Sequence, residues 1–441
     1  MSLFFTVSGL RGISLLSLTP EYVLRVAASF CNLYETPFLI VGRDSRPSGR
    51  YFIHAVISAA LSKGKKVLDS KIVPTPTLVY SVKNREKESS GIIVTASHNP
   101  PEWNALKFVH PEGRFLFEEE IERLKKEIRF FNWEKTFNVG TFKPFDPMEE
   151  HIKGIIENKF VLTEIIKEKK FKVGVDTAGG AGFEAFPLLL KKLGCEVFTM
   201  DTQYGKYERP FELSVENIKK FGDFVREKDL DIGFAMDADG DRLQVVAKGG
   251  EILSEEETLP ICLYYLLSKE KSDIVTNFST TEHVEDVAER FNVRVLRTKV
   301  GEANVLKKMI EEDAIYGGEG NGGVIVKNFN MTRDAFFASA LILSFLTEMG
   351  DSREFKKLFR KRIMKKLKFP ISERKLPEKI EEFLCNLNSS EVNKEDGIRA
   401  KFQEGFIHVR VSNTEPVLRV IMEAKETEVI KEWEKKIKEL I

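Results

Sequence analysis

The sequence has few cysteines, no excess of charge of either sign and no long hydrophobic run. Only four cysteines occur among 441 residues, and no two form a CxxC pair, so we expect buried thiols in a reducing compartment and no disulfide framework. Lysine plus arginine and aspartate plus glutamate both number 68. This balance gives no reason to expect nucleic acid or an acidic membrane as a partner.

No stretch of about 18 uninterrupted apolar residues occurs, so we expect no segment that spans a membrane. The first residues, Met1 to Phe5, lack the basic region and the long apolar core of a signal peptide, which favours a cytoplasmic protein. A chain of this length exceeds what one hydrophobic core holds, and we therefore expect several domains.

A pattern of apolar strand, loop, amphipathic helix and second strand recurs three times along the chain. Units of this length imply parallel strands with helical crossovers, and the distance between them fits separate domains of about 100–140 residues. The three patterns span residues 37–68, 172–198 and 272–296.

The last part of the chain has a different pattern, with strands expected at 398–402, 406–411 and 417–422 and a final helix at 426–441. The charged segment 353–368 carries apolar residues at helical spacing, and we interpret it as structural joining material and not as a nucleic-acid patch. The fold class is therefore α/β, with three similar α/β domains and a C-terminal α+β domain. The proposed division is 1–145, 146–250, 251–362 and 363–441.

The most informative motif is Thr-Ala-Ser-His-Asn-Pro at residues 95–100. It follows an apolar run at 91–94 that predicts a buried strand. It precedes a Pro-Pro pair, through which neither a helix nor a β-strand can continue its hydrogen bonding. Ser97 is thus expected in a tight loop at a strand end, beside His98. Taken alone, such a loop is also compatible with ordinary turn residues.

A second cluster places Asp237, Asp239 and Asp241 directly after an apolar run at 232–236 that predicts another strand. Three carboxylates so close together repel one another unless a cation lies among them, and oxygen ligands suit Mg²⁺. An acidic hairpin turn is the alternative. Together with the serine loop, the cluster favours a phosphoryl-transfer site.

Several loops carry groups that suit a phosphorylated sugar. Three arginines are candidates to bind phosphate: Arg11, which lies between glycines, and the two arginines within residues 42–47. The glycine-rich segment 317–323 lacks the Gly-Lys-Ser/Thr of a P-loop, and its carboxylate and amide suit sugar hydroxyls. The loop 410–416, with Arg419 after it, combines a guanidinium, hydroxyls and an amide that suit a phosphate.

These motifs, in this order, resemble those of the α-D-phosphohexomutase family of phosphoglucomutase, phosphomannomutase and phosphoglucosamine mutase. The resemblance implies a heart-shaped, four-domain architecture whose four domains carry, in chain order, a phosphoserine loop, a metal loop, a sugar-binding loop and a phosphate-binding loop. The sequence departs from the family pattern Gly-Glu-x-Ser-Gly-His in the sugar loop, where Asn321 replaces the serine and Gly323 the histidine.

The resemblance also implies a mechanism in which Ser97 carries a phosphate and Mg²⁺ binds the three aspartates and a phosphoserine oxygen. A sugar bisphosphate is then the intermediate and activator. The implied catalytic residues are Ser97, His98, Lys107, Arg11 and Arg242, with Lys107 as general acid/base. The implied substrate-binding residues are Lys299, Glu319, Asn321, Arg410, Ser412, Asn413, Thr414 and Arg419.

The expected activity is the interconversion of hexose 1-phosphate and hexose 6-phosphate, as a phosphoglucomutase/phosphomannomutase or, alternatively, a phosphoglucosamine mutase. The expected partner is a small phosphosugar, with no nucleic acid or membrane, and the chain is expected to be a monomer or a homodimer. Two other classes remain open: a metal-dependent phosphatase with Ser97 as nucleophile, and a non-catalytic phosphosugar sensor.

Overall fold

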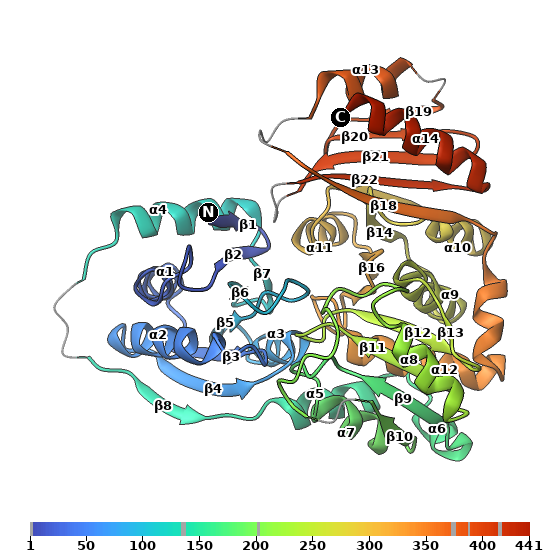
Figure 1. The fold of residues 1–441 in the computed structure, drawn as a ribbon. Coiled ribbons are helices and arrows are strands. Elements are labelled where there is room, and N and C mark those ends of the chain that lie inside the picture. Colours follow the sequence, from blue (N-terminus) through green and yellow to red (C-terminus); the bar gives the residue numbers. More distant parts are fainter. Residues whose placement is uncertain (1–2, 134–137, 201–202, 372–375, 387–388, 413–416) are drawn as a thin grey trace.

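The fold is taken from a computed structural model, which describes residues 3–133, 138–200, 203–371, 376–386, 389–412 and 417–441. Four β-sheets follow one another along the chain, and each has its own helices (Figure 1). We refer to the parts around these sheets as the first, second, third and C-terminal units. Their sheets span residues 4–144, 172–252, 274–326 and 363–424.

The first unit is built on a mixed sheet with the strand order β1-β2-β6-β5-β3-β4-β8, and β7 pairs with β6. The predicted strand–helix–strand pattern is present, because β3 pairs in parallel with both β4 and β5. All six residues of β5 are buried, as the apolar run before the serine loop predicts. The elements are β1 Phe4–Thr6, β2 Gly9–Ile13, α1 Pro20–Leu33, β3 Phe38–Arg43, α2 Gly49–Ser62, β4 Lys66–Ile72, α3 Thr75–Lys83, β5 Ser89–Val94, β6 Trp103–His110, β7 Arg114–Phe115, α4 Glu118–Phe130 and β8 Thr141–Pro144.

The second unit has the strand order β10-β9-β11-β12-β13, in which β9 pairs in parallel with β10 and β11. Its predicted pattern at 172–198 is confirmed, and β11 is the expected buried strand before the aspartates. The elements are α5 Met148–Ile156, α6 Thr163–Lys169, β9 Lys172–Asp176, α7 Ala185–Lys192, β10 Glu196–Thr199, α8 Lys219–Glu227, β11 Ile232–Met236, β12 Leu243–Ala247 and β13 Glu251–Ile252.

The third unit has the order β15-β14-β16-β17, again with parallel pairing where the sequence predicts it. Its long helix α12 is buried from Ala335 to Leu346, and one apolar cluster runs through both the second and the third unit. The elements are η1 Glu255–Glu257, α9 Thr258–Lys269, β14 Ile274–Asn277, α10 His283–Phe291, β15 Val295–Thr298, α11 Glu302–Glu311, β16 Tyr316–Glu319, β17 Gly323–Val326, α12 Ala335–Met349 and η2 Ser352–Leu358.

The C-terminal unit is an antiparallel sheet in the order β18-β22-β21-β20-β19 with two helices on it. The helical interpretation of 353–368 is wrong in its second half. A short 3₁₀ helix ends at Leu358, and from Ile363 the chain forms β18, which pairs along its whole length with β22. The elements are β18 Ile363–Pro370, α13 Glu378–Asn386, β19 Glu391–Asn393, β20 Ile398–Lys401, β21 Gly405–Val411, β22 Val417–Ala424 and α14 Thr427–Leu440.

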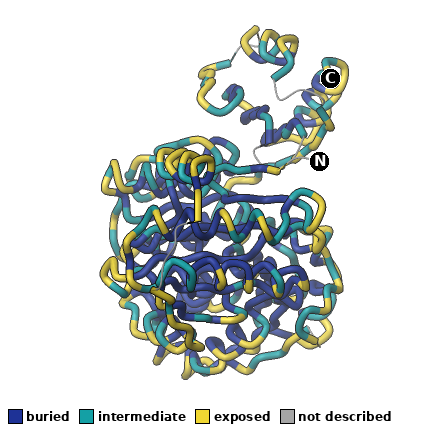
Figure 2. The backbone as a smooth tube through the Cα atoms, turned by 90° about the vertical axis from the view of Figure 1, so that its left-hand side faces the viewer, coloured by how far each residue is buried: buried dark blue, intermediate teal, exposed yellow. Residues whose placement is uncertain are grey.

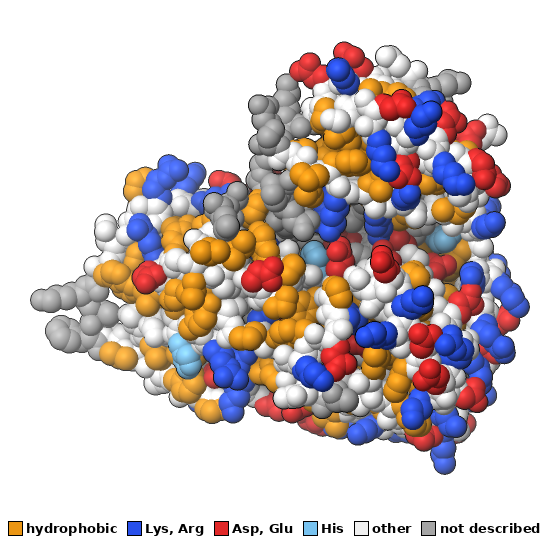
Figure 3. All heavy atoms as spheres, viewed as in Figure 1, with side chains coloured by type: hydrophobic (Ala, Val, Ile, Leu, Met, Phe, Trp, Pro, Cys, Tyr) orange, Lys and Arg blue, Asp and Glu red, His pale blue; other side chains and the backbone are white. Residues whose placement is uncertain are grey.

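The C-terminal unit stands above a body formed by the other three, and the buried backbone is concentrated in that body (Figure 2). The outline is notched between the first unit and the C-terminal unit, which gives the expected heart shape (Figure 3). Within the described residues, no helix combines the length and the apolar character needed to cross a membrane. Three cysteines are free and buried as expected, but Cys385 is free and exposed.

Candidate active site

All four units contribute to the walls of one cleft of about 380 Å³. The serine loop after β5 lines it with Ser97 and His98, and the metal loop after β11 lines it with Arg242, whereas the three aspartates are not among the lining residues. The carboxyl ends of parallel strands are the usual place for ligands in such sheets. The predicted residues that line the cleft are Arg11, Ser97, His98, Lys107, Arg242, Glu319, Asn321, Arg410, Ser412 and Arg419.

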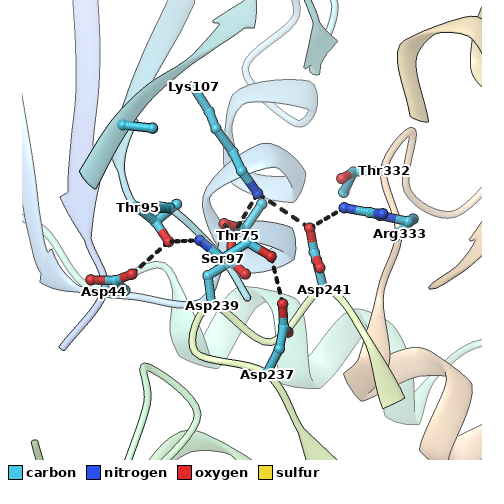
Figure 4. A network of polar contacts seen from close by, with 12 residues as sticks. Asp44, Thr75, Thr95, Ser97, Lys107, Asp237, Asp239, Asp241, Thr332 and Arg333 are labelled. Carbon is cyan, nitrogen blue, oxygen red and sulfur yellow. Dashed lines mark hydrogen bonds and ion pairs between the residues drawn. The ribbon is translucent and has the colours of Figure 1, made fainter. Parts of the chain in front are cut away.

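Ser97 has φ near +50°, a left-handed conformation that is strained for a residue with a side chain. Hydrogen bonds hold it there: its N–H donates to Thr95 Oγ1 at 3.0 Å, and its carbonyl accepts from Arg46. Thr95 in turn donates to Asp44 Oδ2 at 2.6 Å (Figure 4). The loop is thus fixed in the shape that directs the Ser97 hydroxyl toward the metal loop.

The two arginines of the 42–47 loop do not serve phosphate, and this expectation is wrong. Arg46 is fully buried, forms an ion pair with Asp44 at 2.8 Å and donates to the carbonyls of Pro100 and Trp103. Arg43 donates to the Asp44 carbonyl, and neither arginine lines the cleft. The buried Arg46 therefore stabilises the serine loop from behind.

The three aspartates of the metal loop are fully buried, and one carboxylate oxygen of each lies within 4.8 Å of the others. Ser97 Oγ donates to Asp237 Oδ2 at 2.6 Å (Figure 4). Oδ1 of both Asp239 and Asp241 is buried without a hydrogen-bond partner. Orphaned buried carboxylate oxygens are costly, and this oxygen-only set fits Mg²⁺.

The charges around the metal loop act in opposite directions on its carboxyls. Burial, together with Asp241 and Asp239, raises the pKa of Asp237 well above its usual range. Burial also opposes ionisation of Asp241, but Arg333, Lys107 and Arg242 hold the pKa of Asp241 below its usual range. One carboxyl is thus neutralised by cations of the protein, whereas Asp237, beside Ser97, is compensated only in part by Arg242 at 3.9 Å.

Lys107 reaches the metal loop from β6, with Nζ at 2.7 Å from Asp239 Oδ2 and 3.2 Å from Asp241 Oδ2. Burial disfavours the ammonium, but these two carboxylates raise the pKa of Lys107 above its usual value. The same Asp239 oxygen accepts from Thr75 Oγ1 at 2.7 Å, a contact that the sequence alone did not suggest.

Cations surround the serine on the side of the cleft. Arg11 is buried and donates to Asn99 Oδ1, while burial and the neighbouring Arg46 and Arg242 lower the pKa of Arg11 to about 10. His98 is buried, and burial with nearby arginines lowers the pKa of His98 well below its usual range. The positive charge of Arg11 and Arg242, which the aspartates of the metal loop offset only in part, suits a phosphate group.

The sugar loop is held mainly through Glu319, at the end of β16. Its Oε1 accepts from Asn277 Nδ2 at 2.9 Å and from the Gly301 N–H at 3.0 Å, and its Oε2 accepts from Arg333 at 2.6 Å. Asn321 donates weakly to Glu319 at 3.5 Å, and its buried Oδ1 has no hydrogen-bond partner. Glu319 is therefore fixed in place while Asn321 keeps an acceptor available.

On the C-terminal side, Arg410 is buried on β21 and its Nε lies 3.2 Å from Asp396 Oδ2. Arg419 on β22 is directly opposite Arg410 and donates to Ser412 Oγ at 3.4 Å. The structure thus brings the two arginines of the predicted phosphate loop together. Two other predicted residues, Asn413 and Thr414, lie outside the described residues.

Lys299 is not brought to the cleft: it is exposed, and the wall begins at the next residue, with Val300 to Ala303. The sequence analysis missed three basic residues that do line it, Arg333, Lys366 and Lys368. The two lysines alternate with Leu367 and Phe369 on β18, and this period of two was the available signal for a strand with a charged face. Arg333 has no comparable pattern.

Comparisons with known proteins give the same architecture along the whole chain. Family models described as phosphoglucomutase/phosphomannomutase match as alpha/beta/alpha domain I at residues 2–132, domain II at 149–250 and domain III at 254–365, and as the C-terminal domain at 365–440. The chain belongs to the phosphoglucomutase/phosphomannomutase family.

Individual relatives cover the chain almost completely. A phosphoglucomutase/phosphomannomutase of Thermococcus kodakarensis is 33% identical over 98% of this chain and 97% of the relative. A probable phosphoglucosamine mutase of Pyrococcus horikoshii is 31% identical over 100% of this chain and 98% of the relative. The crystal structure of a Burkholderia thailandensis family protein superposes with a TM-score of 0.86 at 25% identity, over 99% of this chain and 96% of that one. The activity is that of a phosphohexomutase, an isomerase that moves a phosphoryl group within a sugar phosphate.

Proposed function

We propose that this chain interconverts hexose 1-phosphates and hexose 6-phosphates by way of a phosphate on Ser97 and a bisphosphorylated sugar. The observation that carries the proposal is the position of Ser97 Oγ, 2.6 Å from Asp237 in a cleft that also contains Glu319 and Arg410. A nucleophile, a hydroxyl acceptor and a phosphate-binding arginine then share one cavity, and the nucleophile is in direct contact with the candidate cation site.

Asp237, Asp239 and Asp241 would hold Mg²⁺ together with an oxygen of phosphorylated Ser97. When bound, the ion supplies positive charge where negative charge develops during phosphoryl transfer. The N-acetylphosphoglucosamine mutase of Aspergillus fumigatus, a distant relative, was solved with GlcNAc-6P and magnesium, and a variant of it with glucose 1,6-bisphosphate. These complexes support both the metal and the bisphosphate.

The remaining roles follow from where the described side chains lie, and those of Asn413 and Thr414 from the family resemblance alone. Lys107, close to the metal loop and in the cleft, is the proposed general acid/base. Arg11 and Arg242 steady the phosphoryl group, and His98 completes that wall. Arg410 and Arg419, with Ser412, Asn413 and Thr414, bind the phosphate that does not react. Glu319 and Asn321 bind sugar hydroxyls. Lys299, which is exposed and does not line the cleft, is the remaining candidate contact for substrate phosphate.

Glucose and mannose phosphates are the preferred substrates in this proposal, in keeping with the name of the Thermococcus kodakarensis relative. Glucosamine phosphate is the second candidate, because several relatives of similar identity are named probable phosphoglucosamine mutases. A coupled assay with the three 1-phosphates side by side decides between them. Stoichiometric 6-phosphate without free phosphate excludes a phosphatase, and turnover excludes a sensor.

The phosphoryl carrier is tested with Ser97→Ala. Loss of the nucleophile should lower turnover by orders of magnitude. Intact-mass analysis should show one added phosphate on the wild-type chain and none on the variant. Activity of the variant within about threefold of wild type would contradict the role of Ser97, because nucleophile removal normally costs far more.

The metal site is tested by chelation and by Asp239→Ala. EDTA should abolish activity, and added Mg²⁺ should restore it in the wild-type protein only. Full activity of metal-free Asp239→Ala protein would refute the assignment of the metal loop.

A further inference from the structure

Arg333 joins the metal loop to the sugar loop through a single guanidinium group. Its Nη2 donates to Asp241 Oδ2 and its Nη1 to Glu319 Oε2, each at 2.6 Å. The side chain is buried and lines the cleft, and Figure 4 shows it reaching Asp241 from the side opposite to Lys107. A planar fork fixes both the spacing and the mutual orientation of the two carboxylates that it contacts.

The backbone of Arg333 is anchored on both sides. Its N–H donates to Glu302 Oε1 at 2.7 Å, and the next N–H, that of Asp334, donates to the Val324 carbonyl at 2.9 Å. Asp334 also caps α12 by accepting from the Phe337 N–H at 3.0 Å. The guanidinium is therefore held in place before any ligand enters.

A glycine leaves the room that this side chain needs. A Cβ at Gly323 would lie 2.1 Å from Arg333 Cδ and 2.8 Å from its Cγ, so the arginine stem occupies the position of a side chain at residue 323. Gly323 is the direct cross-strand partner of Glu319. The φ of Gly323 is not in the left-handed region, so steric contact with the arginine is what excludes a side chain here.

We propose that Arg333 is a positioning residue of the mutase reaction and that Gly323 is required to admit it. By tying Asp241 to Glu319, Arg333 sets the sugar ring in register with the phosphoryl group on Ser97. This inference rests on the proposed function, since it assigns Asp241 to the metal and Glu319 to the sugar. It adds a residue pair that links those two sites.

The test is a double-mutant cycle with Gly323→Ala, Arg333→Ala and the double variant. Gly323→Ala alone should displace the arginine and lower kcat by about 10²-fold, the cost of misplacing reacting groups by roughly 1 Å. Arg333→Ala should lower kcat by a similar factor. In the double variant the methyl group enters vacated space, so Gly323→Ala should add less than about twofold to the effect of Arg333→Ala.

Two further measurements separate positioning from general destabilisation. Arg333→Lys keeps a cation but has no fork, and its kcat should stay at least about 10-fold below wild type with the KM for sugar phosphate changed less than kcat. Arg114→Met removes a comparable buried arginine, which forms an ion pair with Glu120 at 2.8 Å. Arg114 does not line the cleft, and this variant should leave kcat within about twofold.

Melting temperatures measured on the same four proteins test the contact without any assumption about the reaction. Gly323→Ala should lower the melting temperature in the wild-type background and much less in the Arg333→Ala background. Equal losses of kcat and of melting temperature in both backgrounds would overturn the proposal, as would an Arg333→Ala variant with wild-type kcat. A wild-type protein that turns over no hexose phosphate would overturn the proposed function and the positioning role, while the melting cycle would still decide the steric coupling.

Discussion

The second and third units share one apolar core, whereas the C-terminal unit has a core of its own and meets the third unit through charges. Within the shared core, Phe186 of α7 packs on Phe336 of α12 with ring centroids 5.2 Å apart. At the other junction, Arg362 lies 3.1 Å from Glu282, 2.9 Å from Asp286 and 3.9 Å from Glu423 of β22.

Because of this difference, we expect the two sides of the cleft to differ in rigidity. Burial of apolar surface holds the second and third units together, so the metal loop and Glu319 stay in register. Ionic contacts are directional and are weakened by salt. We therefore expect the C-terminal unit, with Arg410 and Arg419, to change its position while the loops of the body stay fixed. A bisphosphate that must present either phosphate to Ser97 requires such freedom.

The largest effect on stability is expected from Phe186→Ala in the shared core. Phe186 is fully buried, and removal of its ring should lower the free energy of unfolding of the body by about 3–5 kcal/mol. Urea unfolding at low salt and at about 1 M salt should give the same loss, because apolar burial is not screened.

Arg362→Met is the matched change at the ionic junction. It removes the cation that faces Glu282, Asp286 and Glu423, and the destabilisation should shrink at about 1 M salt, where the Debye length is about 3 Å. If Phe186→Ala and Arg362→Met lost stability with the same dependence on salt, the distinction between the two junctions would not hold.

The next effect in size concerns the C-terminal side of the cleft. Arg410→Ala should weaken apparent transition-state binding of all phosphosugars alike by about 2–4 kcal/mol, because it truncates a buried, charge-assisted contact and leaves Asp396 without its cation. The measurement is kcat/KM for glucose, mannose and glucosamine 1-phosphates.

Glu319→Ala is the counterpart on the body side. It should change the ranking of the three sugars, because it removes contacts that depend on the orientation of hydroxyl groups. A shift of the glucose-to-mannose preference by Arg410→Ala, with Glu319→Ala leaving it unchanged, would require the two roles to be exchanged.

The sequence predicts those parts of the site in which a motif follows a strand. The serine and aspartate loops come after apolar runs that are β5 and β11, and parallel sheets place the ends of such strands at ligand clefts. Arg333 could not be found in this way. It follows a loop before α12, and its role depends on contacts with Asp241 and Glu319, which only the tertiary structure brings together.

Arg46 shows the opposite error: its residue type suggested that it binds phosphate, but in the structure it stabilises the serine loop. Its ion pair with Asp44 and its contact with the Ser97 carbonyl use donors that the sequence analysis assigned to phosphate. Burial of an arginine cannot be read from a strand-end loop of mixed polarity. Lys366 and Lys368 were assigned to a helix, because apolar spacing upstream of β18 concealed the shorter alternation within it.

The smallest effect is expected at His408, whose Nδ1 joins the C-terminal unit to the third unit through a hydrogen bond of 2.9 Å with Ser279 Oγ. Its Nε2 forms a hydrogen bond of 2.7 Å with the Asp396 carbonyl of its own unit. Burial, aided by Arg410 and Arg399 and opposed by Asp396, lowers the pKa of His408 to about 4. The unfolded chain then binds the proton first as the pH falls. The contribution of His408 to stability is therefore complete above its ordinary pKa of 6.5 and is lost progressively toward the folded-state pKa of about 4.

Between about pH 7 and pH 5.5 this linkage amounts to roughly 1 kcal/mol. His408→Gln keeps a side chain that hydrogen-bonds but does not titrate here, and all surrounding carboxyls are unchanged. The wild-type protein should therefore lose about 1 kcal/mol more stability than the variant over this interval, measured by urea unfolding at both pH values. Identical losses in the two proteins would show that the ionic junction does not depend on a neutral His408, and the contrast with the apolar junction would then rest on salt alone.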